Sequence, residues 1–170
     1  MKVAFLDRDG TIIRDYPDED WRSAREPEFL PGAMDAMARL LALRYDLIVV
    51  TNQYLIGEGV LSLQEYHSFD RKFQNALAAN GVRVLDTFFC PHARWEGCGC
   101  CKPKPGMIQQ AMAKHPDIDL SQSFLVGDSA ADAGLSAAFG LPFFGIGLPV
   151  KTRIQGLAEV PGLLSSQPSQ

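Results

Sequence analysis

Short apolar runs alternate with longer amphipathic stretches along this chain of 170 residues. An apolar run that stops at a polar residue is typical of a buried strand, and an apolar residue at every third or fourth position is typical of a helix packed on a sheet. The runs predict strands over residues 2–6, 47–50, 82–89, 123–126 and 142–146. The periodic stretches predict helices over residues 33–41, 62–81, 105–115 and 130–139.

Strands that alternate with helices predict the α/β class, with a three-layer, doubly wound sheet of about five parallel strands. We expect one domain over residues 1–150 and a partly flexible C-terminal tail over residues 151–170, whose last residues are rich in Ser, Gln and Pro. Residues 11–31 are polar and contain several prolines, so a long surface loop is expected there. In sheets of this kind ligands bind beyond the carboxyl ends of the strands, where the strand order reverses.

Composition narrows the class of protein. With 46% hydrophobic and 21% charged residues, the chain has the balance of a folded globular protein. A net charge of −4 offers no general attraction to nucleic acid or to an acidic membrane. No apolar run approaches the roughly 18–20 residues that a membrane span needs, and the N-terminus reaches Asp7 too soon for a signal peptide. We therefore expect a cytoplasmic protein, and a monomer.

Acidic residues follow two of the predicted strands. Asp7 and Asp9 come directly after the first strand, and Asp128 follows the fourth, with Asp132 four positions later. Carboxylates gathered at one edge of a sheet repel one another unless a cation or a proton lies between them. Such hard oxygen ligands suit Mg²⁺, which commonly joins carboxylates to a phosphate. The pattern predicts a Mg²⁺ site, and the alternative is an acidic turn that only caps the next helix.

Groups that bind phosphate follow the other strand ends. Thr51 and Asn52 offer a hydroxyl, an amide and backbone N–H groups after the second strand. Lys102 offers a cation just before a helix whose N-terminus also favours an anion. Taken singly, each could be an ordinary turn or surface residue. Their common place at strand ends predicts a site for a small phosphate ester.

The cysteines predict a second metal site. All four lie between positions 90 and 101, too close together for a disulfide framework that closes loops. Cys90, His92, Cys98 and Cys100 supply three thiolates and one imidazole, a ligand set that suits tetrahedral, structural Zn²⁺ in a loop over residues 90–101. The alternative is a loop of reduced cysteines. Cys101 is left over from this set.

The order of these residues resembles that of the haloacid-dehalogenase-like phosphatases. The resemblance covers about residues 2–147 and is carried by four ordered motifs: Asp7-x-Asp9-Gly10-Thr11, Thr51, Lys102, and Gly127-Asp128-x-x-x-Asp132. It implies a phosphomonoester hydrolase with a Rossmann-like sheet. The absence of a long insertion implies that there is no large cap domain.

The resemblance also implies a role for each motif residue. Asp7 would be the nucleophile that forms an aspartyl-phosphate, and Asp9 would protonate the leaving alcohol and then activate water. Thr51 and Lys102 would hold the phosphoryl oxygens. The remaining implied roles are substrate binding by Asn52 and Gly10, Mg²⁺ binding by Asp7, Asp128 and the Asp9 carbonyl, and support of Lys102 or of the metal's waters by Asp132.

The cysteine loop narrows the resemblance to one subgroup. Cys-x-His, Cys-x-Cys and Pro105-Gly106-Met107 resemble the zinc-bearing subgroup that contains D-glycero-D-manno-heptose-1,7-bisphosphate 7-phosphatase and histidinol-phosphate phosphatase. The implied substrate is a sugar phosphate or bisphosphate such as D-glycero-D-manno-heptose 1,7-bisphosphate. Histidinol phosphate and other small phosphorylated metabolites are the alternatives.

Some positions depart from the heptose-phosphatase pattern. Cys101 stands where an arginine usually precedes the motif lysine, Glu58 replaces a basic residue, and Ile13 replaces an asparagine. These losses remove groups that would bind a second phosphate or sugar hydroxyls. Five basic residues in the neighbouring loops could bind a distal anion or be ordinary solvated charges: Arg14, Arg22, Arg25, Arg94 and Lys104.

Two other classes of function remain to be compared with the enzyme. A signalling receiver domain also combines aspartates, a threonine and a lysine on a doubly wound sheet, but its phospho-accepting Asp follows the third strand, where this chain has Cys90. A non-catalytic, zinc-stabilised binding module would be expected to lack Asp7 or Asp9, and both are present. The sequence therefore favours an enzyme.

Overall fold

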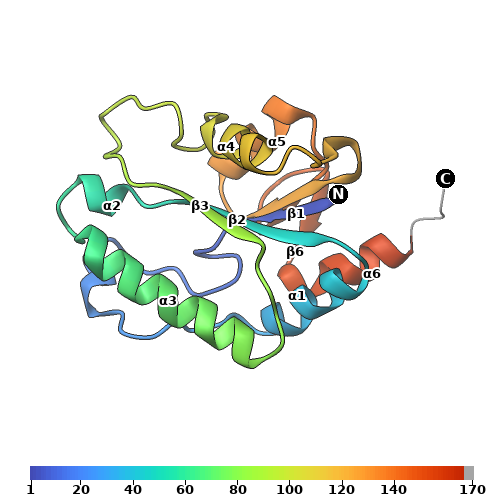
Figure 1. Ribbon diagram of the computed structural model, residues 1–170, viewed down its shortest axis with the longest axis horizontal. Helices are drawn as coiled ribbons and strands as arrows, with labels where there is room; N and C mark the ends of the chain where they lie inside the picture. Colours follow the sequence, from blue (N-terminus) through green and yellow to red (C-terminus); the bar gives the residue numbers. More distant parts are fainter. Residues whose placement is uncertain (167–170) are drawn as a thin grey trace.

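A parallel β-sheet forms the centre of the computed structural model, which describes residues 1–166 (Figure 1). Its strands are β1 (Val3–Leu6), β2 (Asp46–Asn52), β3 (Asp86–Cys90), β4 (Phe124–Gly127), β5 (Phe143–Ile146) and β6 (Thr152–Ile154). They lie in the order β3-β2-β1-β4-β5-β6, and every neighbouring pair is parallel. The predicted α/β class and doubly wound topology are confirmed.

Helices cover both faces of the sheet. They are α1 (Ala33–Ala42), α2 (Tyr54–Gly57), α3 (Leu63–Ala79), α4 (Gly106–Lys114), α5 (Ala130–Phe139) and α6 (Val160–Ser165). Helices α1, α3 and α6 lie on one face, and α4 and α5 lie on the other (Figure 1). Helix α2 is a single turn directly after β2. None of the helices in residues 1–166 has the length and apolar character to cross a membrane.

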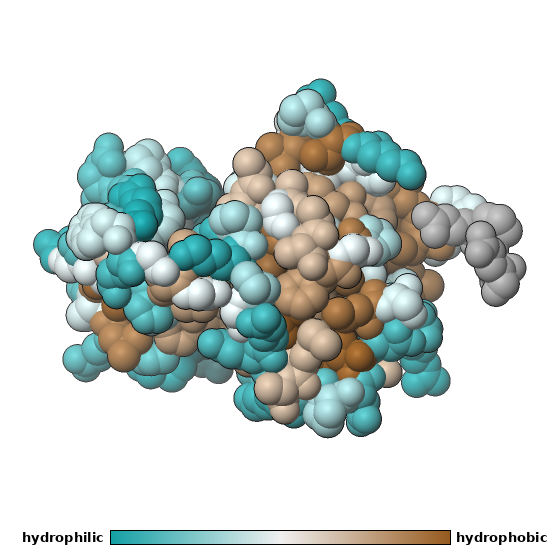
Figure 2. Space-filling view, turned by 90° about the horizontal axis from the view of Figure 1, so that it is seen from above, coloured by the Kyte–Doolittle hydropathy of each residue, from teal (hydrophilic) through white to brown (hydrophobic). Residues whose placement is uncertain are grey.

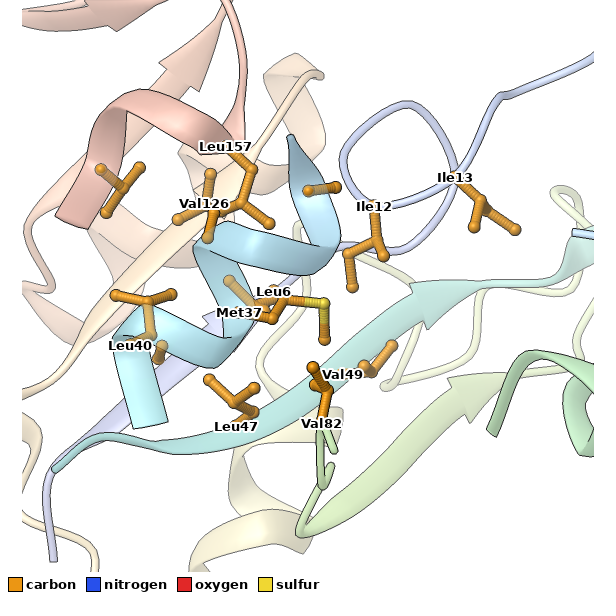
Figure 3. Close-up of a cluster of buried hydrophobic side chains, with 14 of the residues drawn as sticks. Leu6, Ile12, Ile13, Met37, Leu40, Leu47, Val49, Val82, Val126 and Leu157 are labelled. Atoms are coloured by element: carbon orange, nitrogen blue, oxygen red, sulfur yellow. The ribbon is translucent and has the colours of Figure 1, made fainter. Parts of the chain in front are cut away.

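Alternation along the central strand builds two separate cores. In β1, Ala4 and Leu6 point to the α1/α3/α6 face, and Val3 and Phe5 point to the α4/α5 face. Side chains of an extended strand alternate between its faces, so four consecutive apolar residues supply both cores at once. Figure 3 shows the first core, where Met37 of α1 packs among side chains from β1, β2 and β4.

The sheet has six strands where the sequence predicts about five. The sixth comes from the segment expected to be a tail, which the structure folds through residue 166 as β6 and α6. Three apolar residues of this segment are almost fully buried, because they pack in the same core as side chains of β4 and β5: Ile154, Leu157 and Val160. Of the expected flexible end, residues 167–170 lie outside the described part of the chain.

Two other segments differ from expectation. Strand β3 begins at Asp86 rather than at residue 82, although Val82 is buried in the core. The loop over residues 11–31 is not purely a surface loop, because Ile12, Ile13 and Trp21 are buried in the first core. These apolar anchors hold the loop against the carboxyl end of the sheet.

The strand order reverses at β1, with β2 and β3 on one side and β4, β5 and β6 on the other. This reversal opens a crevice at the carboxyl ends of β1, β2 and β4, which is where ligands bind in sheets of this type. The view from the α4/α5 side shows hydrophilic residues gathered on the lobe that contains α2 and the loop after β3 (Figure 2).

Candidate active site

A cavity of about 250 Å³ opens at the carboxyl ends of the strands. Six of the predicted site residues line it: Asp7, Asp9, Thr51, Asn52, Lys102 and Asp128. They come from four separate stretches of the chain, which the parallel sheet brings to one edge. Two more predicted residues lie directly behind them, namely Gly10 and Asp132.

Lys102 is the centre of a buried ion-pair network. Its ammonium donates to Asp7 Oδ1 at 2.6 Å, to Asp132 Oδ1 at 2.7 Å and to the Val50 carbonyl at 2.9 Å. Burial by itself lowers the pKa of Lys102, but Asp7 and Asp132 outweigh burial and raise it overall. The lysine is therefore a fixed positive charge beside the Asp7 carboxylate.

Asp132 is fully buried and its orientation is fixed by the start of α5. Its Oδ2 accepts hydrogen bonds from the Ser129 hydroxyl and backbone N–H, while Ser129 in turn caps the helix at the Asp132 N–H. This reciprocal arrangement is a capping box. A Cβ at Gly127 would collide with the Asp132 side chain, so the glycine is required for this packing.

Three carboxylates converge beside Lys102. One oxygen each from Asp7, Asp128 and Asp132 lies within 4.8 Å of the others. Burial raises the pKa of Asp7, as does the charge of Asp132, and burial together with Asp132 raises the pKa of Asp128 to about 6. Such carboxylates are stable as anions when a cation joins them, so the donor set fits a hard divalent ion. Gly10 (φ 86°) makes room for the Asp128 carboxylate, which a Cβ there would strike.

The Asp9 carboxylate lies outside this group of three. Two residues that are two positions apart would project to the same side of an extended strand, but β1 ends at Leu6 and the backbone turns at Arg8. The Asp9 carboxylate instead accepts hydrogen bonds from Arg8 and from Gln53. Its backbone carbonyl is the part that the resemblance assigns to the metal.

The loop after β2 supports the other half of the site. Asn52 accepts a hydrogen bond from the Lys102 backbone N–H and donates one to the Lys102 carbonyl, which fixes the lysine backbone. Thr51 is almost fully buried, and its hydroxyl oxygen accepts from the Gln53 side chain. In this structure Asn52 positions Lys102 through the backbone.

The cysteine loop forms a compact cluster. Cys90, His92, Cys98 and Cys100 each place one ligand atom within 4.8 Å of the others. The sulfur of Cys98 lies 3.5 Å from that of Cys90 and 3.7 Å from that of Cys100, whereas the sulfurs of Cys90 and Cys100 lie 2.9 Å apart and would be moved apart by a bound ion. Tetrahedral Zn²⁺ with Zn–S bonds of about 2.3 Å separates its sulfur ligands by about 3.8 Å. The four side chains therefore fit a closed zinc site.

The thiol of Cys98 is already predisposed to ionise. Burial opposes its ionisation, but hydrogen bonds from backbone N–H groups, including that of Cys101 at 3.4 Å, lower the pKa of Cys98 to about 7. Since a thiolate is the form that binds metal, this favours metal binding at neutral pH. Burial raises the pKa of Cys101, and its side chain is not part of the cluster.

The cysteine loop packs between α2 and α4. A Cβ at Gly57 would collide with the loop backbone at His92 and Ala93, and a Cβ at Gly106 would collide with Gly99 and Cys100. These close backbone contacts require glycine on both helices. The loop is therefore in direct contact with α2, which follows Thr51 and Asn52, and with α4, which follows Lys102.

Arg94 joins three loops beside Tyr54, whose side chain lines the cavity. Its guanidinium makes two hydrogen bonds of 2.7 Å to Glu58 and one of 2.9 Å to Asp18, and it lies 4.2 Å from the centre of the Tyr54 ring. The unusual Glu58 is therefore the partner of Arg94. Because Arg94 is already paired with two carboxylates, it is not available as a free cation for a distal anion.

The other basic candidates also have partners, with one exception. Arg14 pairs with Glu28, Arg22 donates to the Val60 carbonyl, and Lys104 donates to carbonyl groups of the cysteine loop. Arg25 is exposed and lines a pocket that also contains Trp21 and Gln53.

Sequence reasoning missed Arg8 and Gln53 as site residues. Gln53 donates to Asp9 at 2.7 Å and to Thr51 at 2.9 Å, and Arg8 holds Asp9 from the opposite side. The available signal was position alone, because Arg8 lies between the two motif aspartates and Gln53 follows Thr51-Asn52.

Known proteins match this chain over most of its length. The family model of polynucleotide kinase 3 phosphatase matches residues 2–143. The D-glycero-alpha-D-manno-heptose-1,7-bisphosphate 7-phosphatase of Mycobacterium tuberculosis is 40% identical over 132 residues, covering 78% of this chain and 70% of that protein. The corresponding beta-anomer enzyme of Pseudomonas putida is 37% identical over 140 residues, covering 82% and 79%.

Solved structures agree with the sequence relatives. The D,D-heptose 1.7-bisphosphate phosphatase of B. bronchiseptica, crystallised with magnesium and phosphate, superimposes with a TM-score of 0.84 and 31% identity, covering 97% of this chain and 98% of that one. The cavity, the ordered motifs and these relatives lead to one assignment. The chain belongs to the haloacid-dehalogenase-like phosphatases, in the family of the heptose-1,7-bisphosphate 7-phosphatases.

Proposed function

We propose that this protein hydrolyses a phosphomonoester of a small sugar phosphate through an aspartyl-phosphate on Asp7. The observation that carries the proposal is the contact of 2.6 Å between the Lys102 ammonium and the Asp7 carboxylate at the floor of the cavity. A cation beside a nucleophilic carboxylate offsets its repulsion from a phosphate dianion. Asp132 and Asn52 hold that lysine in place from two sides.

Mg²⁺ is the proposed catalytic cofactor. Asp7, Asp128 and the Asp9 carbonyl would hold it, and its chemistry is to neutralise charge on the phosphoryl oxygens. The carboxylate oxygens of Asp7 and Asp128 lie close enough to share one ion. The related structure from B. bronchiseptica contains both magnesium and phosphate, which supports this assignment.

The proposed reaction has two steps. In the first, Asp7 bonds to phosphorus as the ester P–O bond breaks, and Asp9 gives its proton to the leaving oxygen. In the second, Asp9 takes a proton from water as the water oxygen bonds to phosphorus and the Asp7–phosphorus bond breaks. Thr51 and Lys102 would hold the phosphoryl oxygens in both steps.

Zn²⁺ is the proposed structural ion of the loop over residues 90–101. The four ligands would leave no open position on a tetrahedral ion, so it would stabilise the loop rather than take part in the reaction. The loop packs on α2 and α4, on either side of the cavity. Its folded state therefore supports the site.

D-glycero-D-manno-heptose 1,7-bisphosphate is the first substrate to test, because the relatives in Mycobacterium tuberculosis and Pseudomonas putida are named for its two anomers. Purified protein with Mg²⁺ is expected to release inorganic phosphate from one or both anomers. The highest kcat/KM in a panel of sugar mono- and bisphosphates is expected for this substrate. Release from no ester in the panel would contradict the proposed function.

Histidinol phosphate is a second candidate for a specific reason. The Asp15 carboxylate lines the same cavity as Asp7 and Asp128. A carboxylate at that wall would attract the amino group of an amino-alcohol phosphate. If histidinol phosphate has the higher kcat/KM of the two, this candidate replaces the heptose bisphosphate.

Mg²⁺ is expected to stabilise the protein at neutral pH and to lose this effect as the pH falls through about 6, where the Asp128 carboxyl takes up a proton. A carboxyl must be ionised to bind metal. At 100 times its Kd, Mg²⁺ is expected to raise Tm by about 5–10 °C. Thermal melts with and without Mg²⁺ across this pH range measure the effect.

In the metal-free protein, ionisation of the Asp128 carboxyl has the opposite effect on stability. Because its pKa is raised in the folded state, Asp128 destabilises the fold when ionised, and this contribution declines as the pH falls from about 6 and is lost by about 4. Asp128→Asn is expected to remove the Mg²⁺ effect, whereas Asp35→Asn, at an exposed position of α1, is the matched control. An unchanged Mg²⁺ shift in Asp128→Asn would contradict the metal assignment.

A further inference from the structure

Arg8 is a buried charge that the proposed reaction leaves without a role. It lies between Asp7 and Asp9 in the chain and is only 1% exposed. Its Nε donates to Asp9 Oδ1 at 2.8 Å, and its Nη2 donates to Asp9 Oδ2 at 3.1 Å. This is the two-point contact between a guanidinium and a carboxylate, which fixes the plane of the carboxylate as well as its position.

The far side of Arg8 is itself held in place. Its guanidinium carbon lies 5.4–5.9 Å from the ring centres of Trp21, Tyr66 and Phe69, and Nη1 lies 3.8 Å from Asp70, close enough for charge attraction but without a hydrogen bond. Removing a guanidinium from water is costly unless it is paired and surrounded by such groups. The surroundings therefore make Arg8 a rigid support rather than a flexible surface charge.

Gln53 contacts the same carboxylate from the other side. Its Nε2 donates to Asp9 Oδ2 at 2.7 Å and to Thr51 Oγ1 at 2.9 Å. The Asp9 carboxylate thus receives three hydrogen bonds from two side chains and cannot rotate without breaking them. Both Asp9 and Gln53 line the cavity, so this oriented carboxylate faces the reaction.

We propose that Arg8, with Gln53, is a positioning residue that holds the Asp9 carboxylate in the orientation needed for proton transfer. The inference rests on the proposed function. The Asp9 carboxyl must give a proton to the leaving oxygen in the first step and accept one from water in the second. A loose carboxylate would meet neither oxygen in a productive geometry, and small displacements of this kind are costly in rate.

The two steps can be separated by the choice of ester. Nitrophenolate leaves as a stable anion, so cleavage of nitrophenyl phosphate needs no proton from Asp9 in the first step. The second step still needs Asp9, because water must lose a proton as it attacks. A defect confined to Asp9 therefore slows the second step with this ester and both steps with an alkyl phosphate.

Arg8→Lys and Arg8→Met test the inference in rapid-mixing experiments with nitrophenyl phosphate. The ratio of the burst rate of nitrophenolate to the steady-state rate is expected to rise at least about tenfold above wild type. The steady-state rate with an alkyl phosphate is expected to fall by about 10²-fold. The inhibition constant of inorganic phosphate is expected to change by less than about threefold, because Lys102 and Thr51 are untouched.

Arg83→Met is the matched control, since Arg83 is exposed and precedes β3 at the amino end of the sheet. Arg8→Lys retains a positive charge between Asp9 and Asp70, so it is the variant to use if the methionine variant does not fold. If neither Arg8 variant folds, the same three measurements on Gln53→Met test whether the hydrogen bonds to Asp9 are needed for proton transfer.

The outcomes separate this inference from the proposed function. Suppose that the wild-type protein releases phosphate and that the Arg8 variants fold. If these variants keep the wild-type ratio of burst rate to steady-state rate and the wild-type rate with alkyl phosphate, the proposed role of Arg8 is wrong. A parallel fall in Tm, in phosphate affinity and in the burst rate of nitrophenolate would also overturn the proposed role, because such a fall would indicate that Arg8 is purely structural. A wild-type protein that turns over no ester would instead overturn the proposed function.

Discussion

Asp7→Asn is expected to abolish phosphate release, lowering kcat by at least about 10⁴-fold. An amide of the same shape cannot attack phosphorus to form the acyl phosphate, and it places no charge opposite Lys102. The steady-state rate with nitrophenyl phosphate measures the loss. Labelled phosphate that stays on the protein after an acid quench and is released by hydroxylamine should be absent from the variant after mixing with labelled ester.

Asp7→Asn is expected to lose its activity but to remain folded. Asp7 lies beside the negative charges of Asp128 and Asp132, so a neutral side chain relieves repulsion in the metal-free protein. Lys102 keeps its contact of 2.7 Å with Asp132. Metal-free Asp7→Asn should therefore melt no lower than wild type, and Asp35→Asn should keep full activity. Appreciable turnover by Asp7→Asn would contradict the nucleophile assignment.

Cys98→Ser is expected to give the largest loss of stability. Removing one of the four proposed zinc ligands should lower the free energy of unfolding by roughly 3 kcal/mol or more, because metal binding and loop folding are coupled. For a chain of this size that corresponds to a fall in Tm of about 6–12 °C. Metal analysis of the purified variant should also show loss of zinc.

Cys101→Ser is the matched control for this change. The two cysteines lie in the same loop, but the Cys101 sulfur is not part of the ligand cluster. Its replacement by serine should leave zinc content and Tm unchanged. Equal zinc content in wild type and Cys98→Ser would show that the proposed ligand set is wrong.

The sequence predicted those site residues that directly follow the apolar run of a strand. Asp7, Thr51 and Asp128 each follow an apolar run, and in a parallel sheet those runs must end at one edge. The cluster of Cys90, His92, Cys98 and Cys100 was predictable for a similar reason, because its members lie within eleven residues and need no long-range folding to meet. The structure brings both groups together as expected.

The features that the sequence did not predict depend on contacts between distant segments. Glu58 and Arg94 are 36 positions apart, and neither has a local pattern that indicates the other. Strand β6 is only three residues long, too short for its alternation to be recognised. The burial of Arg8 was not predictable, because it depends on aromatic residues 13–61 positions away.

The Arg94 contact has a consequence for selectivity. Arg94 comes two residues after His92, yet its side chain holds Glu58 and Asp18 on the opposite loops. The zinc ion proposed for the cysteine loop would therefore also help to hold Arg94 against the ring of Tyr54, which lines the cavity. A zinc-starved protein would retain its nucleophile and its lysine, which are anchored in the sheet, but would discriminate less sharply between bulky and compact esters.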